Sequence, residues 1–178
     1  MLEKHNSFNS FICKNTKFMH GNCIKEINLF IEKYLDKNNK LKILDVGSYN
    51  VNGCFKKYFK NPNWEFIGLD IKEGRGVDVV TKDPYKYPFL DNYFDVVISG
   101  NTLEHIEDLH AIIMEIVRIT KSLVWISVPN TIKEHKYPID CWRIFPDGMR
   151  FLLENIGKLK ILECRISGID TIGIAKKV

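Results

Sequence analysis

Short apolar runs alternate along this chain with segments in which apolar residues recur every three or four positions. The runs predict strands at 41–47, 64–71, 77–81, 94–100 and 122–129, and two more in LKILECRIS and DTIGIAKK near the end. The helical spacing predicts helices over about Asn22 to Leu35, 53–60, a stripe from Ile106 to Val117, and about 147–156. Strands that are apolar on both sides are buried on both faces, so the pattern predicts an α/β protein with a mostly parallel sheet between helices.

Length and composition favour one domain. The chain has 178 residues, 45% of them hydrophobic, which is enough for one full core. We expect a helical lead-in or lid over 1–38 and the core over 41–178. The net charge of +4 comes from 26 basic and 22 acidic residues spread along the chain, so no nucleic-acid partner is expected.

The cysteines and the N-terminal sequence point to a cytoplasmic protein. The five cysteines are an odd number and include no C-x-x-C pair, which suits a reducing compartment. The N-terminal sequence lacks the apolar core of a signal peptide, and no apolar run approaches the roughly 18 residues of a membrane span. We therefore expect no membrane association. The oligomeric state cannot be predicted from these features.

Ligands of such sheets bind at the carboxyl ends of the strands, and the turn after the first strand is informative. From Gly47 it reads G-S-Y-N-V-N-G, with Tyr49 and Asn52 where a dinucleotide-binding turn needs glycine. The Asp45 carboxylate would also repel a pyrophosphate, so a nicotinamide cofactor is disfavoured. Asp70, at the end of the second strand, can accept hydrogen bonds from both hydroxyls of a ribose. The expected ligand is a nucleoside with an uncharged or cationic tail.

These residues belong to a longer pattern. It consists of LDVG at 44–47, Asp70, PFLD at 88–91, FDVV at 94–97 and LEH at 103–105. In this combination the chain resembles a class I S-adenosylmethionine-dependent methyltransferase of the small methyltransferase-domain type. The resemblance covers about residues 40–178, and it implies a Rossmann-like, doubly wound sheet of seven strands with the last strand antiparallel.

The resemblance also implies a cofactor site. Gly47 and the following backbone would lie under the methionine part of S-adenosylmethionine, Asp70 would bind the ribose, and Ile71 would pack on the adenine. Asp83 would bind the adenine amino group, but the next residue, Pro84, has no N–H for the adenine ring. A hydrogen bond to the ring would then come from Tyr85 or from water, or would not form. The full predicted set is Asp45, Gly47, Ser48, Tyr49, Asp70, Ile71, Asp83, Pro84, Gly100 and Asn101.

Glu104 and His105 admit an acid/base role, but a local alternative is favoured for Glu104. Asn101-x-x-Glu104 is a capping-box pattern directly before the apolar stripe. His105 and His110 are five residues apart, about 140° around a helix, so they would not share a face as metal ligands do. No metal site is expected.

The segment PNTIKEHKYPIDCWRIFPDGMRFLLE after the fifth strand has two interpretations. In one it is structural, with Trp142 and Phe145 buried and Arg143 paired with Asp140. In the other it forms the acceptor wall, with Arg143 holding an anionic or polyhydroxyl group and His135 accepting a proton. It resembles a segment of methyltransferases from bacterial glycan and nucleotide-sugar pathways.

The predicted function is methyl transfer from S-adenosylmethionine to a small polar molecule, such as a sugar or sugar nucleotide. The candidate catalytic residues are His135, Arg143 and His105. The main alternative is a non-catalytic S-adenosylmethionine-binding or scaffold protein of the same fold.

Overall fold

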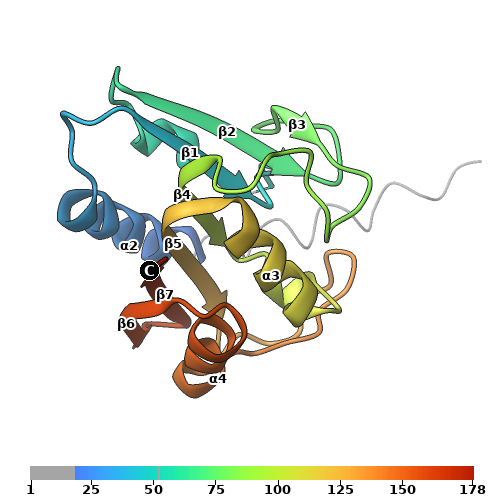
Figure 1. Cartoon of the computed structure of the whole chain (residues 1–178). Coiled ribbons are helices and arrows are strands. Elements are labelled where there is room, and N and C mark those ends of the chain that lie inside the picture. Colours follow the sequence, from blue (N-terminus) through green and yellow to red (C-terminus); the bar gives the residue numbers. More distant parts are fainter. Residues whose placement is uncertain (1–18, 52) are drawn as a thin grey trace, which may run out of the picture.

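Seven strands form one sheet in the order β3-β2-β1-β4-β5-β7-β6 (Figure 1). A computed structural model describes residues 19–51 and 53–178. The strands are β1 (Leu41–Val46), β2 (Trp64–Asp70), β3 (Val79–Val80), β4 (Phe94–Gly100), β5 (Thr120–Pro129), β6 (Lys160–Ser167) and β7 (Asp170–Lys176). Strands β1 to β5 pair in parallel, and β7 is antiparallel to both β5 and β6. The predicted seven-stranded, mostly parallel sheet with an antiparallel last strand is confirmed.

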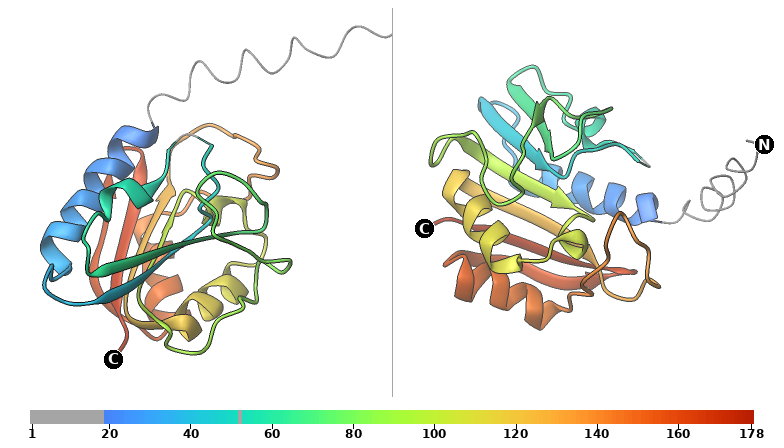
Figure 2. Two further views of the ribbon diagram at one scale, coloured as in Figure 1. Left: turned by 90° about the horizontal axis from the view of Figure 1, so that it is seen from above. Right: turned by 90° about the vertical axis from the view of Figure 1, so that its right-hand side faces the viewer.

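Helices cover both faces of this sheet. Helix α2 (Met19–Tyr34) lies on one face, and α3 (Leu109–Ile119) and α4 (Pro146–Arg150) lie on the other (Figure 2). A π-helical segment, Phe151–Ile156, continues α4. The helices predicted over 22–35 and 147–156 are confirmed, and α2 begins three residues earlier than expected.

The central strands place alternate side chains in two separate cores. In β1, Ile43 packs in the core under α2, whereas Leu44 packs in the core under α3 and α4. In β5, Trp125 packs on the α2 side, and its neighbours Val124 and Ile126 pack on the other. Because both faces are covered, consecutive residues are apolar, which explains the continuous runs in the sequence.

The helix predicted over 53–60 is wrong. Only a 3₁₀ turn, Phe55–Tyr58, forms there, and none of its residues is fully buried. Phe55 meets the ring of Trp125 edge-on with 5.7 Å between centroids. Phe59, the next residue after the turn, is buried against Trp64 and Phe66, so the apolar residues of this segment are buried without a longer helix.

The predicted capping box is also wrong. Helix α3 begins at Leu109, and its N-cap is Asp108, whose side chain accepts a 2.9 Å hydrogen bond from the Ala111 N–H. Leu103–His105 instead forms a 3₁₀ turn, which ends at Ile106 in an extended conformation. The extended residue separates Glu104 from the helix, so its carboxylate is free for another role.

The first 18 residues of the expected N-terminal lead-in lie outside the described residues. The described part, α2, packs Ile27 and Phe30 into the core beneath it. Within 19–51 and 53–178, no helix has both the length and the apolar character needed to cross a membrane.

Candidate functional site

The turn after β1 is closed by Gly47, whose φ of 82° lies in the left-handed region. A Cβ at this position would lie 2.0 Å from Oγ1 of Thr102, so a side chain is excluded by backbone conformation and by contact. The N–H groups of Gly47 and Ser48 donate to the carbonyl oxygen of Leu69 at 2.9 and 3.1 Å. The turn is thereby packed against the ends of both β2 and β4.

Asp70 joins the loops after β1 and β2. Its Oδ2 accepts a 3.0 Å hydrogen bond from the Tyr49 N–H, and its Oδ1 accepts one of 3.1 Å from the Lys72 N–H. A carboxylate oxygen has two acceptor positions, so each oxygen can still accept a ribose hydroxyl. The neighbouring Ile71 side chain is 57% exposed and is free to pack on a planar base.

Asp45 adds a second carboxylate close to this turn. Its side chain is buried, and burial together with the charge of Asp70 raises the pKa of Asp45 to about 8. A cation near both carboxylates would favour the ionised form of Asp45, whereas a dianion would be repelled. The electrostatics therefore suit a sulfonium and amino group better than a pyrophosphate.

The segment expected to bind adenine is held by its own aspartate. Oδ1 of Asp83 accepts a 2.8 Å hydrogen bond from the Tyr85 N–H. Pro84 has no N–H, so the backbone donor of Tyr85 is the one available at this turn, and it is already engaged. Asp83 itself is exposed.

Ser48, Gly100 and Asn101, the remaining predicted cofactor-binding residues, differ in their contacts with the rest of the protein. The Ser48 hydroxyl is buried and has no hydrogen-bond partner among the described residues. A Cβ on Gly100 would lie 2.6 Å from the Phe55 ring, so this glycine is required by packing. Asn101 has a φ of 52°, and its N–H donates to the carbonyl of Ser127 at 2.8 Å.

Arg143 ties together the loop between β5 and α4. Its Nη1 and Nη2 donate to the two oxygens of Asp140 at 2.6 and 2.7 Å. Its other donors bind the carbonyl oxygens of Ile132, Lys133 and Trp142 at 2.7 to 3.1 Å. These hydrogen bonds hold the pKa of Asp140 well below its usual range.

A cavity of about 240 Å³ lies along this loop. Its lining includes the exposed ring of Trp142, whose Nε1 donates a 2.7 Å hydrogen bond to the carbonyl of Ile106. Glu134 supplies an exposed carboxylate to the same lining, whereas the carboxylate of Asp140 is nearly buried and is held by Arg143. The cavity therefore combines an aromatic face with hydrogen-bond acceptors.

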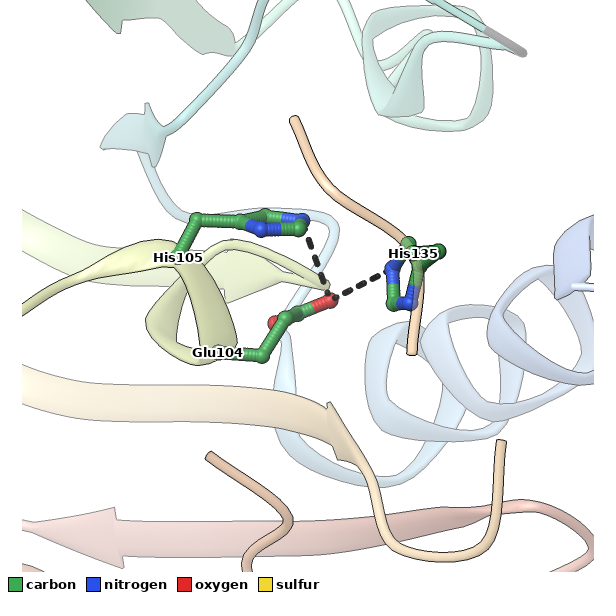
Figure 3. Close-up of side chains that lie close together, drawn as sticks. All are labelled: Glu104, His105 and His135. Atoms are coloured by element: carbon green, nitrogen blue, oxygen red, sulfur yellow. Dashed lines mark ion pairs between the residues drawn. The ribbon is translucent and has the colours of Figure 1, made fainter. Parts of the chain in front are cut away.

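The same loop brings His135 to His105 and Glu104 (Figure 3). Oε1 of Glu104 lies 3.7 Å from Nε2 of His105 and 3.8 Å from Nε2 of His135. The Glu104 side chain is fully buried, and burial raises its pKa to about 8. Burial likewise lowers the pKa of His105. A neutral imidazole can accept a proton, and the raised pKa of the neighbouring Glu104 means that this carboxyl group ionises less readily than usual.

The structure therefore brings His105 and His135 together, and Arg143 lies directly behind His135, with 3.3 Å between Nη2 and Nδ1. Sequence reasoning missed Glu104 as part of this group because the capping-box pattern explained it locally. The available signal was its place in the LEH block after β4, next to a predicted site residue. His110 is exposed and away from the group.

Comparison with known proteins agrees with this architecture. Residues 44–127 match a family described as a methyltransferase domain. An uncharacterized methyltransferase of Schizosaccharomyces pombe is 27% identical over 112 residues, which cover 52% of this chain and 40% of that protein. The chain thus spans less than half the length of that relative.

Solved structures share the fold at low identity. A SAM-dependent methyltransferase from Aquifex aeolicus has 16% identity and a TM-score of 0.62 over 88% of this chain and 97% of its own. The 1,6-didemethyltoxoflavin-N1-methyltransferase of Burkholderia thailandensis, with 1,6-didemethyltoxoflavin and S-adenosylhomocysteine bound, has 15% identity and a TM-score of 0.67 over 87% of this chain and 78% of its own. The chain is thus similar over residues 44–127 to a methyltransferase-domain family, and its fold is that of S-adenosylmethionine-dependent methyltransferases.

Proposed function

We propose that this protein transfers the sulfonium methyl group of S-adenosylmethionine to a small polar acceptor, with a sugar or sugar nucleotide as the preferred class. The observation that carries the proposal is the junction of Asp70 with the Tyr49 N–H, which places a carboxylate with free acceptor positions beside the glycine turn. The exposed side chain of Ile71 adds an apolar surface on which the adenine ring of the cofactor can pack. Asp45 supplies negative charge for the cationic part of the cofactor once that cation favours its ionised form.

The chemistry is an in-line displacement. A lone pair of the acceptor forms the new bond to the methyl carbon, and the electron pair of the broken carbon–sulfur bond stays on sulfur, giving neutral S-adenosylhomocysteine. The cofactor supplies the reactivity, so the protein has to align the two molecules and exclude water. An oxygen acceptor also has to lose its proton.

His105 and His135 are the candidates to receive that proton. The lowered pKa of His105 keeps its imidazole neutral at pH 7, as a base requires. Its Nδ1 lies 2.5 Å from the carbonyl oxygen of Ile139, so Nδ1 carries the hydrogen and Nε2 is left as the acceptor. This leaves the basic nitrogen on the side of Glu104 and His135.

The composition of the loop cavity supports a polyhydroxyl acceptor. The ring of Trp142 offers an apolar face for a sugar, and the exposed carboxylate of Glu134 offers an acceptor for its hydroxyl groups. Arg143 supports this arrangement indirectly, because its donors hold Asp140 and three loop carbonyls. In this proposal it positions the wall instead of binding the acceptor.

A non-catalytic cofactor-binding protein is the second candidate. The specific observation in its favour is that the donors of Arg143 are engaged within the loop, so this cation is not free to bind an anionic acceptor. Such a protein would bind S-adenosylmethionine without turnover on any acceptor.

Calorimetry followed by an acceptor screen tests the proposal. We expect binding of S-adenosylmethionine and S-adenosylhomocysteine, and none of NAD at comparable concentration. A screen of sugars and sugar nucleotides with methyl-labelled cofactor should then yield a labelled product. Cofactor binding without any labelled product would favour the non-catalytic candidate, and tight NAD binding alone would overturn both.

A further inference from the structure

We propose that Glu104, His105 and His135 bind one divalent transition-metal cation of the zinc class. Their ligand atoms face one another in Figure 3 and all lie within 4.8 Å of one another. Two imidazole nitrogens and one carboxylate oxygen form a donor set that such cations bind readily. The residues come from two segments, the turn after β4 and the loop after β5, so only the folded chain assembles the set.

Three buried polar atoms of this cluster have no hydrogen-bond partner among the described residues. Neither carboxylate oxygen of Glu104 has a hydrogen-bond partner among the described residues, and the side chain is 0% exposed. Nε2 of His135 is also buried without a partner in the described part of the chain. Leaving a buried polar atom unpaired costs about 1–3 kcal/mol, and more for a charged group. A cation bound in this cluster would satisfy Nε2 of His135 and one of the two Glu104 oxygens.

The far side of each imidazole is held as in known metal sites. Nδ1 of His105 lies 2.5 Å from the Ile139 carbonyl oxygen, and Nδ1 of His135 lies 3.3 Å from Oδ2 of Asp140. A hydrogen on each Nδ1 leaves each Nε2 lone pair free for the metal. Carbonyl and carboxylate groups are the usual outer partners of metal-binding histidines, and they fix the ring orientation.

Arg143 does not compete for this hydrogen-bonding arrangement. Its Nη2 also lies 3.3 Å from Nδ1 of His135, but its two hydrogens have closer acceptors, Oδ2 of Asp140 at 2.7 Å and the Lys133 carbonyl at 3.1 Å. With those hydrogens engaged, Nδ1 can carry its own hydrogen, and Oδ2 of Asp140 lies 3.3 Å from it. Arg143 fixes Asp140, and Asp140 in turn fixes the histidine.

The distances match a zinc-class cation after a small closure. Bonds of about 2.0–2.2 Å in tetrahedral geometry place two ligand atoms about 3.4 Å apart. The two separations from Glu104 Oε1 are 3.7 and 3.8 Å, and all the ligand atoms lie within 4.8 Å of one another, so no separation has to shorten by more than about 1.4 Å. Mg²⁺ and Ca²⁺ prefer oxygen ligands, so a set with two nitrogens disfavours them.

Three protein ligands leave a fourth position open, as in catalytic zinc sites. A bound metal would occupy the Nε2 lone pairs, so His105 and His135 would then act as ligands and not as bases. An acceptor hydroxyl at the open position would lose its proton more easily because the cation lowers its pKa. The metal site stands apart from the proposed methyl transfer, since it can be measured without cofactor or acceptor.

Zinc titration of the full chain after chelator treatment tests the site. Calorimetry with ZnCl₂ should show one equivalent bound, and Co²⁺ should give a visible spectrum without the strong thiolate band that a cysteine ligand would add. Glu104→Gln, His105→Ala and His135→Ala should each weaken zinc binding at least 100-fold. Asp140→Asn should weaken it about 10- to 100-fold, as outer-shell changes do.

Two exposed neighbours provide matched controls. His110→Ala removes an imidazole outside the cluster, and Cys141→Ser removes a thiol from the same loop, so both should bind zinc like the parent. Cooperative thermal unfolding shows which variants are folded, and only those are compared. Absent zinc binding in the parent, or undiminished binding in the folded Glu104 and histidine variants, would overturn the proposal while leaving methyl transfer open.

Discussion

The guanidinium of Arg143 holds both carboxylate oxygens of Asp140, with hydrogen bonds of 2.6 and 2.7 Å. The Asp140 side chain is 1% exposed, so this ion pair is nearly withdrawn from solvent at its acidic end. His135 is attached to the same carboxylate through its N–H, at 2.5 Å. The position of the His135 imidazole, a candidate catalytic group, thus depends on the ion pair between Arg143 and Asp140.

Arg143→Ala should lower the free energy of unfolding by about 2–4 kcal/mol, because it leaves a buried carboxylate unpaired. Arg143→Lys should recover part of this loss, since Lys keeps the charge but not the planar fork. Denaturant unfolding measures the effect, and Arg150→Ala, at an exposed arginine on α4, is the control. Unchanged stability with abolished methyl transfer would instead indicate that Arg143 acts on the acceptor.

His135→Ala should separate turnover from cofactor binding. We expect the rate of methyl transfer to fall about 100-fold or more, the usual effect of losing an acid/base group, with S-adenosylhomocysteine affinity within about twofold of the parent. Steady-state kinetics on an identified acceptor and calorimetry measure the two properties. His110→Ala is the matched control. A parallel fall in affinity and turnover would point to a role in holding the loop together.

Asp70→Ala should weaken cofactor binding by about 1.5–3 kcal/mol, because a charged acceptor loses hydrogen bonds to two ribose hydroxyls. Calorimetry with S-adenosylhomocysteine gives the affinity. Glu73→Ala removes an exposed negative charge three residues further on and should leave affinity unchanged. Equal dissociation constants for the parent and Asp70→Ala would place the ribose elsewhere.

Gly47→Ala should cost about 2 kcal/mol or more of stability and abolish measurable cofactor binding, because the added Cβ meets Thr102 and the φ of 82° is strained for alanine. The double variant with Thr102→Ala should recover part of the stability by removing the Oγ1 and Cγ2 contacts. Thermal unfolding of the single and double variants measures this. Equal stabilities of Gly47→Ala and the parent would contradict the geometry of the turn.

Asp45 should make stability fall with rising pH. Its pKa is about 8 in the folded protein and near its ordinary value of 3.8 in the unfolded chain. Between these values the folded state holds a proton that the unfolded state releases, so the free energy of unfolding decreases from about pH 4 to about pH 8. Asp45→Asn cannot ionise and should flatten this dependence in denaturant unfolding at pH 5, 7 and 9.

The same ionisation should tune cofactor preference. The affinity for S-adenosylmethionine relative to its neutral product should rise as pH passes through about 8, because ionised Asp45 attracts the sulfonium charge. Glu73→Gln, at an exposed carboxylate, should retain both pH effects of the parent. Identical pH profiles for the parent and Asp45→Asn would contradict the raised pKa.

Much of the fold follows from local patterns in the sequence. Ile43 and Leu44 are consecutive apolar residues because helices cover both faces of β1. Burial on both faces could therefore be predicted from the apolar run in the sequence. Gly47 and Asp70 could be placed together from the sequence because parallel strands end at the same edge of a sheet. Their roles in binding remain predictions, whereas their proximity is a property of the fold.

Glu104 shows what the sequence alone could not decide. From the sequence, the capping-box pattern with Asn101 explained this residue locally, whereas in the structure helix α3 is capped by Asp108. The loop after β5 decides the outcome, because the N–H groups of Cys141 and Trp142 donate to the Glu104 carbonyl at 2.7 and 3.3 Å. These long-range contacts bury the carboxylate and bring His135 to it. Local sequence determines the strands and turns, but the docking of a distant loop determines which charges lose their water, since burial is a property of the whole packed chain.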